Sequence, residues 1–165
     1  MSKTVFVTVG TTTFYTLTKT TSSKHLCKVF KTLGYNKLTM QTGKIDFDIE
    51  DSDVDDFTLE HFEYKDSIAD DIKGASLVIS HAGAGSVLDV LGAGKPLLVV
   101  INEELQGNHQ IELAHQLAVD GHLYYCTCSS LCEKLQSCDF TKLKPLPSGK
   151  PEKFASFLDS ALGFS

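Results

Sequence analysis

The chain has 165 residues, 42% of them apolar and 22% charged, which is the size and balance of a single domain that buries a hydrophobic core. Its net charge of −6 argues against nucleic acid as a partner, because affinity for the phosphate backbone comes mainly from clustered lysine and arginine. A secreted or membrane-embedded chain is not expected either, because no apolar run approaches the roughly 20 residues that span a bilayer and residues 1–10 lack a signal-peptide pattern.

Short runs of β-branched and aromatic residues alternate along the chain with segments whose apolar residues recur at helical spacing. The first part predicts a strand at 4–9, a helix at 22–34, a strand at 37–41, an exposed acidic loop at 45–56 and a strand at 57–62. The second part predicts a helix at 66–73, a strand at 77–80, a helix at 85–91, a strand at 97–101, a helix at 108–121 and a strand at 123–126. Such alternation predicts a parallel sheet with right-handed crossovers and helices on both faces, an α/β fold of the Rossmann-like kind.

Polar residues that can cap a helix N-terminus precede three of the predicted helices. They are Ser22 and Ser23 for the first, Asp66 and Ser67 for the second, and Asn108 for the last. Glycine follows each of these helices, as expected where a helix ends.

The Rossmann-like domain is expected to occupy residues 1–143. Residues 144–151 contain three of the four prolines of the chain and predict a linker. An amphipathic C-terminal helix should complete the segment 144–165, because five apolar residues fall on one helical face. These are Phe154, Phe157, Leu158, Ala161 and Leu162. Two interpretations stay open: the apolar stripe packs on the sheet of this domain, or it docks on a partner protein.

The turn at residues 80–86, Ser-His-Ala-Gly-Ala-Gly-Ser, lies between a predicted strand and a predicted helix. Ligands of open α/β sheets bind at the carboxyl ends of the strands, and the N–H groups of a helix N-terminus bind phosphate. The glycine spacing is neither that of a Walker loop nor that of a dinucleotide-binding loop, which disfavours an ATPase or an NAD enzyme. The candidate ligand contacts in this turn are Ser80, His81, Gly83, Ala84, Gly85 and Ser86.

Gly10, Thr11 and Thr12 follow the first predicted strand, where a glycine permits a tight turn and hydroxyls can reach a phosphate. A simple turn at the end of the strand explains them equally well. Asp89 lies about one helical turn after Ser86 and could accept hydrogen bonds from ribose hydroxyls. Its alternative role is that of a first-turn acid that complements the helix dipole.

The third candidate loop, residues 102–110, is polar apart from one leucine. It ends in Asn108, His109 and Gln110, whose amide and imidazole groups suit the hydroxyls of a sugar. Helix capping alone would also explain Asn108.

All 15 basic residues are lysines, so no guanidinium is available for bidentate contact with phosphate. A bound diphosphate would depend on backbone N–H groups, helix ends and lysine. The five cysteines are an odd number, which is typical of a reducing compartment. Cys128 and Cys132 could be neighbours on a helix, but no pair of histidines at metal spacing accompanies them, so we expect neither a metal nor a cofactor.

Three long motifs resemble the glycosyltransferase family 28 C-terminal domain. They are VFVTVGTT at 5–12, LVISHAGAGS at 77–86 and GKPLLVVINEELQGNHQIELA at 94–114. The resemblance extends from about residue 5 to residue 128, and within the family it is greatest to the cytosolic catalytic subunits of eukaryotic transferases that add a second, β-1,4-linked N-acetylglucosamine to dolichol-pyrophosphate-linked N-acetylglucosamine. Members of the family have the GT-B architecture, in which the C-terminal Rossmann-like half binds the sugar-nucleotide donor.

The resemblance implies that this chain is only the donor half of an inverting transferase that uses UDP-N-acetylglucosamine. The acceptor half and the membrane anchor would then belong to a separate membrane-bound subunit, on which the C-terminal helix could dock, and the acceptor would be lipid-linked. The chain would be cytoplasmic and recruited to the cytosolic face of the endoplasmic reticulum membrane.

By position, the resemblance implies that Gly10 to Thr12 form the phosphate-side loop and that Ala84 to Ser86 contact the diphosphate. Asp89 would be the ribose-binding acid, and His109 and Gln110 would contact the donor sugar. The general base would come from the acceptor half, with His81 as the alternative within this chain. The family requires no metal.

Three residues depart from the family pattern as we interpret it. Asp89 stands where glutamate is usual, Tyr15 stands where close relatives tend to have an acid, and Lys44 replaces a usual arginine. A second hypothesis is therefore a diverged paralogue that binds a UDP-sugar or the partner with little or no turnover. A third is a nucleotide-binding adaptor unrelated to glycans.

Overall fold

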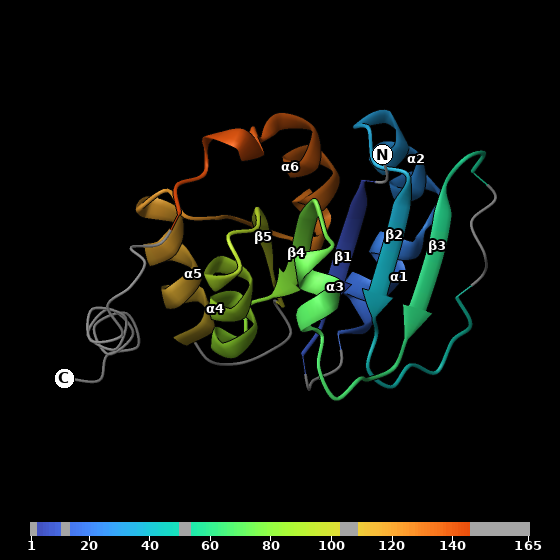
Figure 1. Ribbon diagram of the computed structural model, residues 1–165, viewed down its shortest axis with the longest axis horizontal. Helices are drawn as coiled ribbons and strands as arrows, with labels where there is room; N and C mark the ends of the chain where they lie inside the picture. Colours follow the sequence, from blue (N-terminus) through green and yellow to red (C-terminus); the bar gives the residue numbers. More distant parts are fainter. Residues whose placement is uncertain (1–2, 11–13, 50–53, 103–108, 146–165) are drawn as a thin grey trace.

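The computed structural model describes residues 3–10, 14–49, 54–102 and 109–145 (Figure 1). Its strands are β1 (Thr4–Thr8), β2 (Lys37–Gln41), β3 (Thr58–Phe62), β4 (Leu77–His81), β5 (Leu97–Ile101) and β6 (Tyr124–Thr127). Its α-helices are α1 (Tyr15–Ser22), α2 (Lys24–Thr32), α3 (Ala69–Lys73), α4 (Ala84–Gly92), α5 (His109–Val119) and α6 (Leu131–Ser137). The short 3₁₀ helices η1 (Cys128–Ser130) and η2 (Phe140–Lys142) flank α6.

The strands form one parallel sheet in the order β3-β2-β1-β4-β5-β6. The predicted Rossmann-like architecture is therefore confirmed. The chain order reverses between β1 and β4, which makes their shared end the topological switch point, where open α/β sheets bind ligands. Thr8 pairs with Ser80 at this end, so the loops that follow the two strands start side by side.

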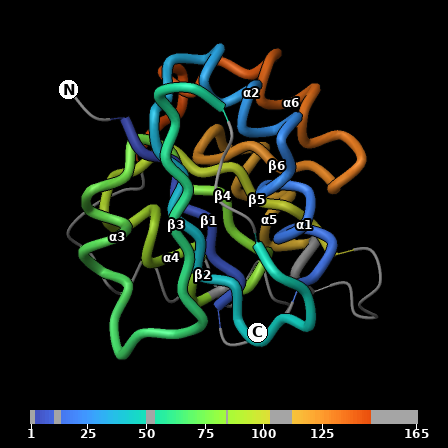
Figure 2. Tube along the Cα trace, turned by 90° about the vertical axis from the view of Figure 1, so that its right-hand side faces the viewer, coloured from blue at the N-terminus to red at the C-terminus, as the bar shows by residue number. Residues whose placement is uncertain are grey.

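Helices cover both faces of the sheet, as predicted. Val5 and Val7 of β1 pack in a core with α1, α2 and α6, whereas Phe6 packs in a second core with α3, α4 and α5. Side chains of a strand alternate between the faces, so a strand that is buried on both sides consists mainly of apolar residues. Figure 2 shows α3 and α4 on one side of the strands and α1 and α2 on the other.

The sequence prediction lacks α1, because Thr and Ser lose conformational freedom or compete for backbone hydrogen bonds inside helices. In the structure the hydroxyls of Thr18 and Thr21 donate to the carbonyls of Tyr15 and Leu17, at 3.0 and 2.8 Å. Leu17 is fully buried. Burial against the sheet therefore stabilises a helix whose own composition does not favour one.

The sequence prediction also lacks α6, which is short and is anchored by the buried side chains of Leu131 and Leu135. Of the predicted capping residues, Ser23 caps α2, whereas the N-cap of α3 is Ile68 without a side-chain cap, and Ser67 only makes a hydrogen bond just before that helix. The Ser23 hydroxyl accepts a hydrogen bond from the N–H of Leu26 at 3.2 Å, and the Ser67 hydroxyl accepts one from the N–H of Ala69 at 3.2 Å.

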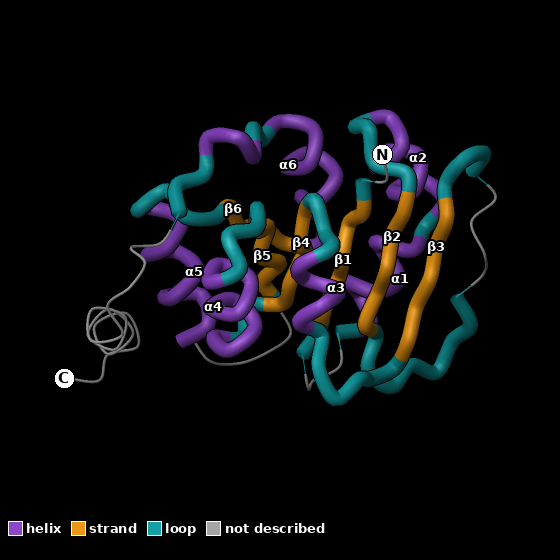
Figure 3. The backbone as a smooth tube through the Cα atoms, viewed as in Figure 1, coloured by secondary structure: helices purple, strands orange, loops and turns teal. Residues whose placement is uncertain are grey.

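The connection between β2 and β3 is a loop throughout its described residues, 42–49 and 54–57, as the acidic composition predicts (Figure 3). Phe47 packs this loop against α1, with its ring centroid 6.4 Å from that of Tyr15 and 4.9 Å from the Lys19 ammonium. The predicted linker and C-terminal helix lie outside the described residues, apart from Lys144 and Pro145. Among the described helices, none combines the length and the apolar character needed to cross a bilayer.

Candidate functional site

His81, the last residue of β4, packs its ring between the two loops of the switch point. Gly10 has a positive φ of 66°, and a Cβ added to it would lie 2.5 Å from Nε2 of His81. A Cβ added to Gly83 would lie 2.2 Å from Cε1 of the same ring. A side chain at either position would therefore require the imidazole of His81 to move.

This packing gives Gly83 a reason to lack a side chain other than the approach of a phosphate. Gly85 differs from it, because an added Cβ would meet nothing within 4 Å. Of the two glycines in the turn, Gly85 is thus the one that borders open space, as the predicted phosphate contact requires.

The imidazole of His81 also holds the first turn of α4. Its Nε2 lies 3.2 Å from the hydroxyl of Ser86. Burial lowers the pKa of His81 below its usual value, so the ring is neutral at pH 7 and has one nitrogen that donates and one that accepts. Ser80 is fully buried and donates its hydroxyl to the His81 carbonyl at 2.9 Å, so it supports the turn from within.

The N-terminus of α4 lacks a side-chain cap. The N-cap residue is Gly83, and no side-chain hydrogen bond closes the first turn. The first helical bond runs from the N–H of Val87 to the Gly83 carbonyl at 3.0 Å. An uncapped first turn directs N–H groups and the positive end of the helix dipole outward, where an anion can accept hydrogen bonds from them.

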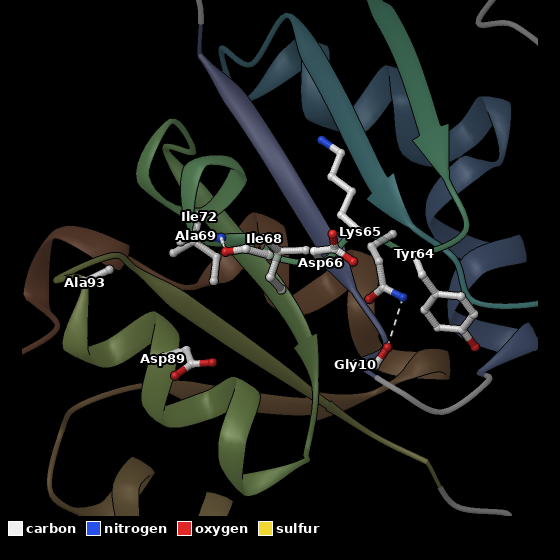
Figure 4. Close-up of a pocket in the computed structure, with 11 residues that line it drawn as sticks. Gly10, Tyr64, Lys65, Asp66, Ile68, Ala69, Ile72, Asp89 and Ala93 are labelled. Atoms are coloured by element: carbon white, nitrogen blue, oxygen red, sulfur yellow. Dashed lines mark hydrogen bonds between the residues drawn. The ribbon is translucent and has the colours of Figure 1, made fainter.

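A cavity of about 480 Å³ adjoins Gly10 on the side of α3 and α4 (Figure 4). Its volume lies in the range of small-molecule sites. Its walls come from the end of β1 and β2, the loop between β3 and α3, and the two helices. The lining residues are Gly10, Gln41, Tyr64, Lys65, Asp66, Ser67, Ile68, Ala69, Ile72, Asp89 and Ala93.

Asp89 lines this cavity from α4, and its side chain is exposed. Figure 4 shows it across the cavity from the loop that contains Tyr64 and Ile68. Because α4 begins at Ala84 and has no acid in its first turn, the alternative role of Asp89 as a first-turn acid is wrong. Its carboxylate stands instead on the wall of a cavity whose other end is the Gly10 loop.

Two parts of this site are absent from the sequence prediction. One is the loop from Tyr64 to Ile68, where Ser67 was interpreted only as a helix cap. The other is Gln41, the last residue of β2, whose side chain is 2% exposed and donates to the Gly10 carbonyl at 2.9 Å. A polar residue at the carboxyl end of a buried strand beside the switch point was the signal that could have identified it.

Several predicted contacts cannot be placed. Thr11, Thr12 and Asn108 lie outside the described residues, and so do the side chains of Ala84, His109 and Gln110. The backbone alone puts Ala84 at the start of α4 and the other two at the start of α5. Their ligand contacts stay predictions.

Two of the three departures from the family pattern lie around the loop after β2. Tyr15 is 43% exposed at the start of α1. Lys44 lines a separate, open hollow with Phe47 and His61. Across the described ranges, no three or more His, Cys, Asp or Glu side chains are grouped so as to hold a metal.

The reversal of strand order, the uncapped helix and the adjoining cavity place the candidate ligand site of this α/β domain at the switch point. The profile of the glycosyltransferase family 28 C-terminal domain matches residues 4–161. The chain belongs to this family, and its fold is that of the C-terminal half of a GT-B glycosyltransferase.

The human UDP-N-acetylglucosamine transferase subunit ALG13 is 53% identical over 129 residues, which are 78% of this chain and 11% of the human protein. The chain thus spans about a tenth of the length of that relative. A solution structure of ALG13 matches with a TM-score of 0.72 at 26% identity, over 95% of both chains. MurG of Acinetobacter baumannii matches with a TM-score of 0.65 at 19% identity, over all of this chain and 46% of MurG, and so supports the fold alone.

Proposed function

We propose that this chain is the donor-binding catalytic subunit of a two-component inverting transferase that moves N-acetylglucosamine from UDP to dolichol-pyrophosphate-linked N-acetylglucosamine, forming the second, β-1,4-linked residue. The observation that carries the proposal is the cavity lined by both Asp89 and Gly10, together with the uncapped N-terminus of α4, where a Cβ added to Gly10 would lie 3.3 Å from the Ser86 hydroxyl. The similarity to proteins named as UDP-N-acetylglucosamine transferase subunits supports UDP as the nucleotide and N-acetylglucosamine as the sugar.

In this proposal the cavity and the N-terminus of α4 bind different parts of the donor. The nucleoside occupies the cavity, where the Asp89 carboxylate accepts hydrogen bonds from the ribose hydroxyls. The diphosphate lies at the first turn of α4 and near Gly10, where backbone N–H groups of the helix N-terminus can donate to it. The sugar then points toward the start of α5, where His109 and Gln110 contact it.

Catalysis in this arrangement depends on stabilising the UDP that leaves. The acceptor 4-hydroxyl attacks the anomeric carbon, the bond from that carbon to the diphosphate oxygen breaks, and the configuration inverts. The helix end stabilises the negative charge that develops on the diphosphate. A base on the acceptor-binding subunit takes the hydroxyl proton, with the neutral imidazole of His81 as the alternative inside this chain.

The fold corresponds to one half of a two-half enzyme, and the human relative is named as a subunit. We therefore assign the acceptor site to a separate membrane-anchored subunit at the cytosolic face of the endoplasmic reticulum. The segment 144–165 is our candidate for the contact with it.

Coexpression with that membrane subunit tests the proposal directly. The complex should transfer N-acetylglucosamine from UDP-N-acetylglucosamine to the lipid-linked acceptor, and a stable complex without transfer would overturn the catalytic role. Calorimetry on the chain alone should show UDP-N-acetylglucosamine bound in preference to ATP and NAD. Preference for ATP would favour the adaptor unrelated to glycans.

The identity of residue 89 favours a second candidate function, that of a paralogue that binds the donor with little turnover. The aspartate side chain is shorter than glutamate by one methylene, or about 1.5 Å, and it stands on the cavity wall. If this is the cause of weak turnover, Asp89→Glu should increase transfer by the complex. An unchanged rate would exclude this explanation.

A further inference from the structure

Gln41 uses its whole hydrogen-bonding capacity on the loops beside the cavity. Its Oε1 accepts from the Thr8 hydroxyl at 2.6 Å and from the N–H of Val9 at 3.2 Å. Its Nε2 donates to the carbonyls of Gly10 and Glu63 at 2.9 and 3.0 Å. A primary amide has two N–H donors and two acceptor positions, so every one of them is occupied. The side chain is 2% exposed.

These bonds begin where the strands stop pairing. The registers of β1 with β2 and of β2 with β3 end at Thr8 opposite Gln41 and at Gln41 opposite Phe62. Beyond that point the Gln41 amide joins the loop after β1 to the loop after β3. The N–H of Gly43 also donates to the Glu63 carbonyl, at 3.1 Å. One side chain thus connects two loops that both line the cavity, the first through Gly10 and the second through residues 64–68.

We propose that Gln41 is a positioning residue for the donor: it fixes the distance between the Gly10 loop, which faces the diphosphate, and the loop of residues 63–68, which faces the nucleoside. This inference rests on the proposed function, because only a ligand that contacts both loops depends on their separation. A ligand that occupies two subsites binds strongly only if the distance between the subsites matches the distance between its two parts.

The chemistry of the amide explains why this position carries glutamine. Its partners are two donors on one side and two carbonyl acceptors on the other. Glutamate would keep the shape but would place an oxygen against the carbonyls of Gly10 and Glu63. Buried acceptors left without donors are costly, so the loops would move apart.

Gln41→Glu and Thr8→Val test the proposal, since each removes part of the network with little change in shape. UDP and uridine are the probes, and calorimetry measures their affinities. We expect the affinity for UDP to fall about tenfold in either variant, while the affinity for uridine changes less than about twofold. Thr8→Ser, which keeps the hydroxyl, should retain the wild-type affinity for UDP.

Thr21→Val is the matched control, because Thr21 is also fully buried and its hydroxyl donates to Leu17, away from this network. It should leave the affinity for UDP unchanged. A folded Gln41→Glu or Thr8→Val protein with wild-type affinity for UDP would overturn the proposal, as would an equal loss for UDP and uridine. If Gln41→Glu does not fold, the exchange rate of the Gly43 amide in Thr8→Val decides, because the Thr8 hydroxyl also accepts directly from the Gly10 N–H at 3.1 Å and a loss of UDP affinity alone would not require Gln41.

Hydrogen exchange separates this proposal from the proposed function. Thr8 touches only the β1 side of the network, so faster exchange at the Gly43 amide in Thr8→Val would show that the two loops are coupled through Gln41. Unchanged exchange at Gly43 would refute the coupling whether or not a nucleotide binds. Wild-type protein that binds no uridine nucleotide would instead overturn the proposed function.

Discussion

Glycines at the two edges of the sheet lack a side chain for different reasons. At the carboxyl edge, Gly10 and Gly83 exclude one because the His81 ring fills the space. At the amino edge, Gly34 and Gly94 have open space around them but φ values of 99° and 73°, which favour glycine at helix ends. Packing against His81 therefore constrains both glycines at the edge that carries the site, in addition to the positive φ of 66° at Gly10, whereas backbone conformation alone constrains Gly34 and Gly94.

Gly83→Ala should have the largest effect, because the added methyl group would collide with the His81 ring. The φ of −71° at Gly83 suits alanine, so any loss would come from the collision and not from backbone strain. Overpacking against His81 should destabilise the fold by about 2 kcal/mol. It should also lower the affinity for UDP-N-acetylglucosamine by about a hundredfold through displacement of the α4 turn. Urea unfolding and calorimetry measure the two effects.

A double-mutant cycle with His81→Ala controls this prediction. If the ring is the obstacle, Gly83→Ala should cost much less stability in the His81→Ala background than in wild type. Additive costs would mean that another contact excludes the methyl group.

Asp89→Asn should have the next largest effect, on binding only. Loss of the charge in a hydrogen bond to ribose should lower the affinity for UDP-N-acetylglucosamine about tenfold. Stability should change little, because the side chain is exposed. Calorimetry gives the affinity and thermal unfolding the stability. Wild-type affinity in this variant would show that the carboxylate does not contact the donor.

Gly94→Ala should affect stability only. An alanine forced into a left-handed conformation should cost about 1 kcal/mol, measured by urea unfolding, with Gly34→Ala as the parallel variant. Donor affinity should stay at the wild-type value in both. A change in affinity would mean that the amino edge is not independent of the site.

The pH dependence of stability should give the smallest effect. Burial lowers the pKa of folded His81, so below the usual histidine pKa the unfolded chain binds more protons than the folded protein. Stability should therefore fall as pH decreases from 7 to 5. Thermal unfolding of His81→Gln should show a smaller loss over the same range. An equal loss would assign the dependence to other groups.

The parallel sheet and the strand-to-helix turn could be predicted because each depends on local patterns. The apolar runs of β1, β4 and β5 are typical of strands buried on both faces. The glycine turn between a strand and a helix could also be predicted, because its glycines and the flanking strand and helix patterns are close together in the sequence. Helical spacing predicts that Asp89 faces the mouth of the turn, and it lines the cavity, whereas the alternative interpretation as a first-turn acid is wrong.

The support beneath the site could not be predicted, because its contacts join distant parts of the chain. Gln41 bonds to residues 31 to 33 positions before it and 22 after it. No local pattern encodes those contacts, and the same holds for the packing of Gly10 against His81. Helix α1 escaped prediction because burial of Leu17, a tertiary effect, outweighs the poor helix propensity of its threonines.

The uncapped first turn of α4 also determines how binding can respond to its surroundings. Main-chain N–H groups do not ionise in the physiological range and cannot be acetylated, methylated or oxidised, so an anion held there is insensitive to the modifications that silence lysine sites. Changes in affinity with pH would then report the ionisation of the ligand and of His81. Substitutions in this turn would change anion affinity only by shifting the backbone, so side chains that leave the backbone in place would have little effect on binding.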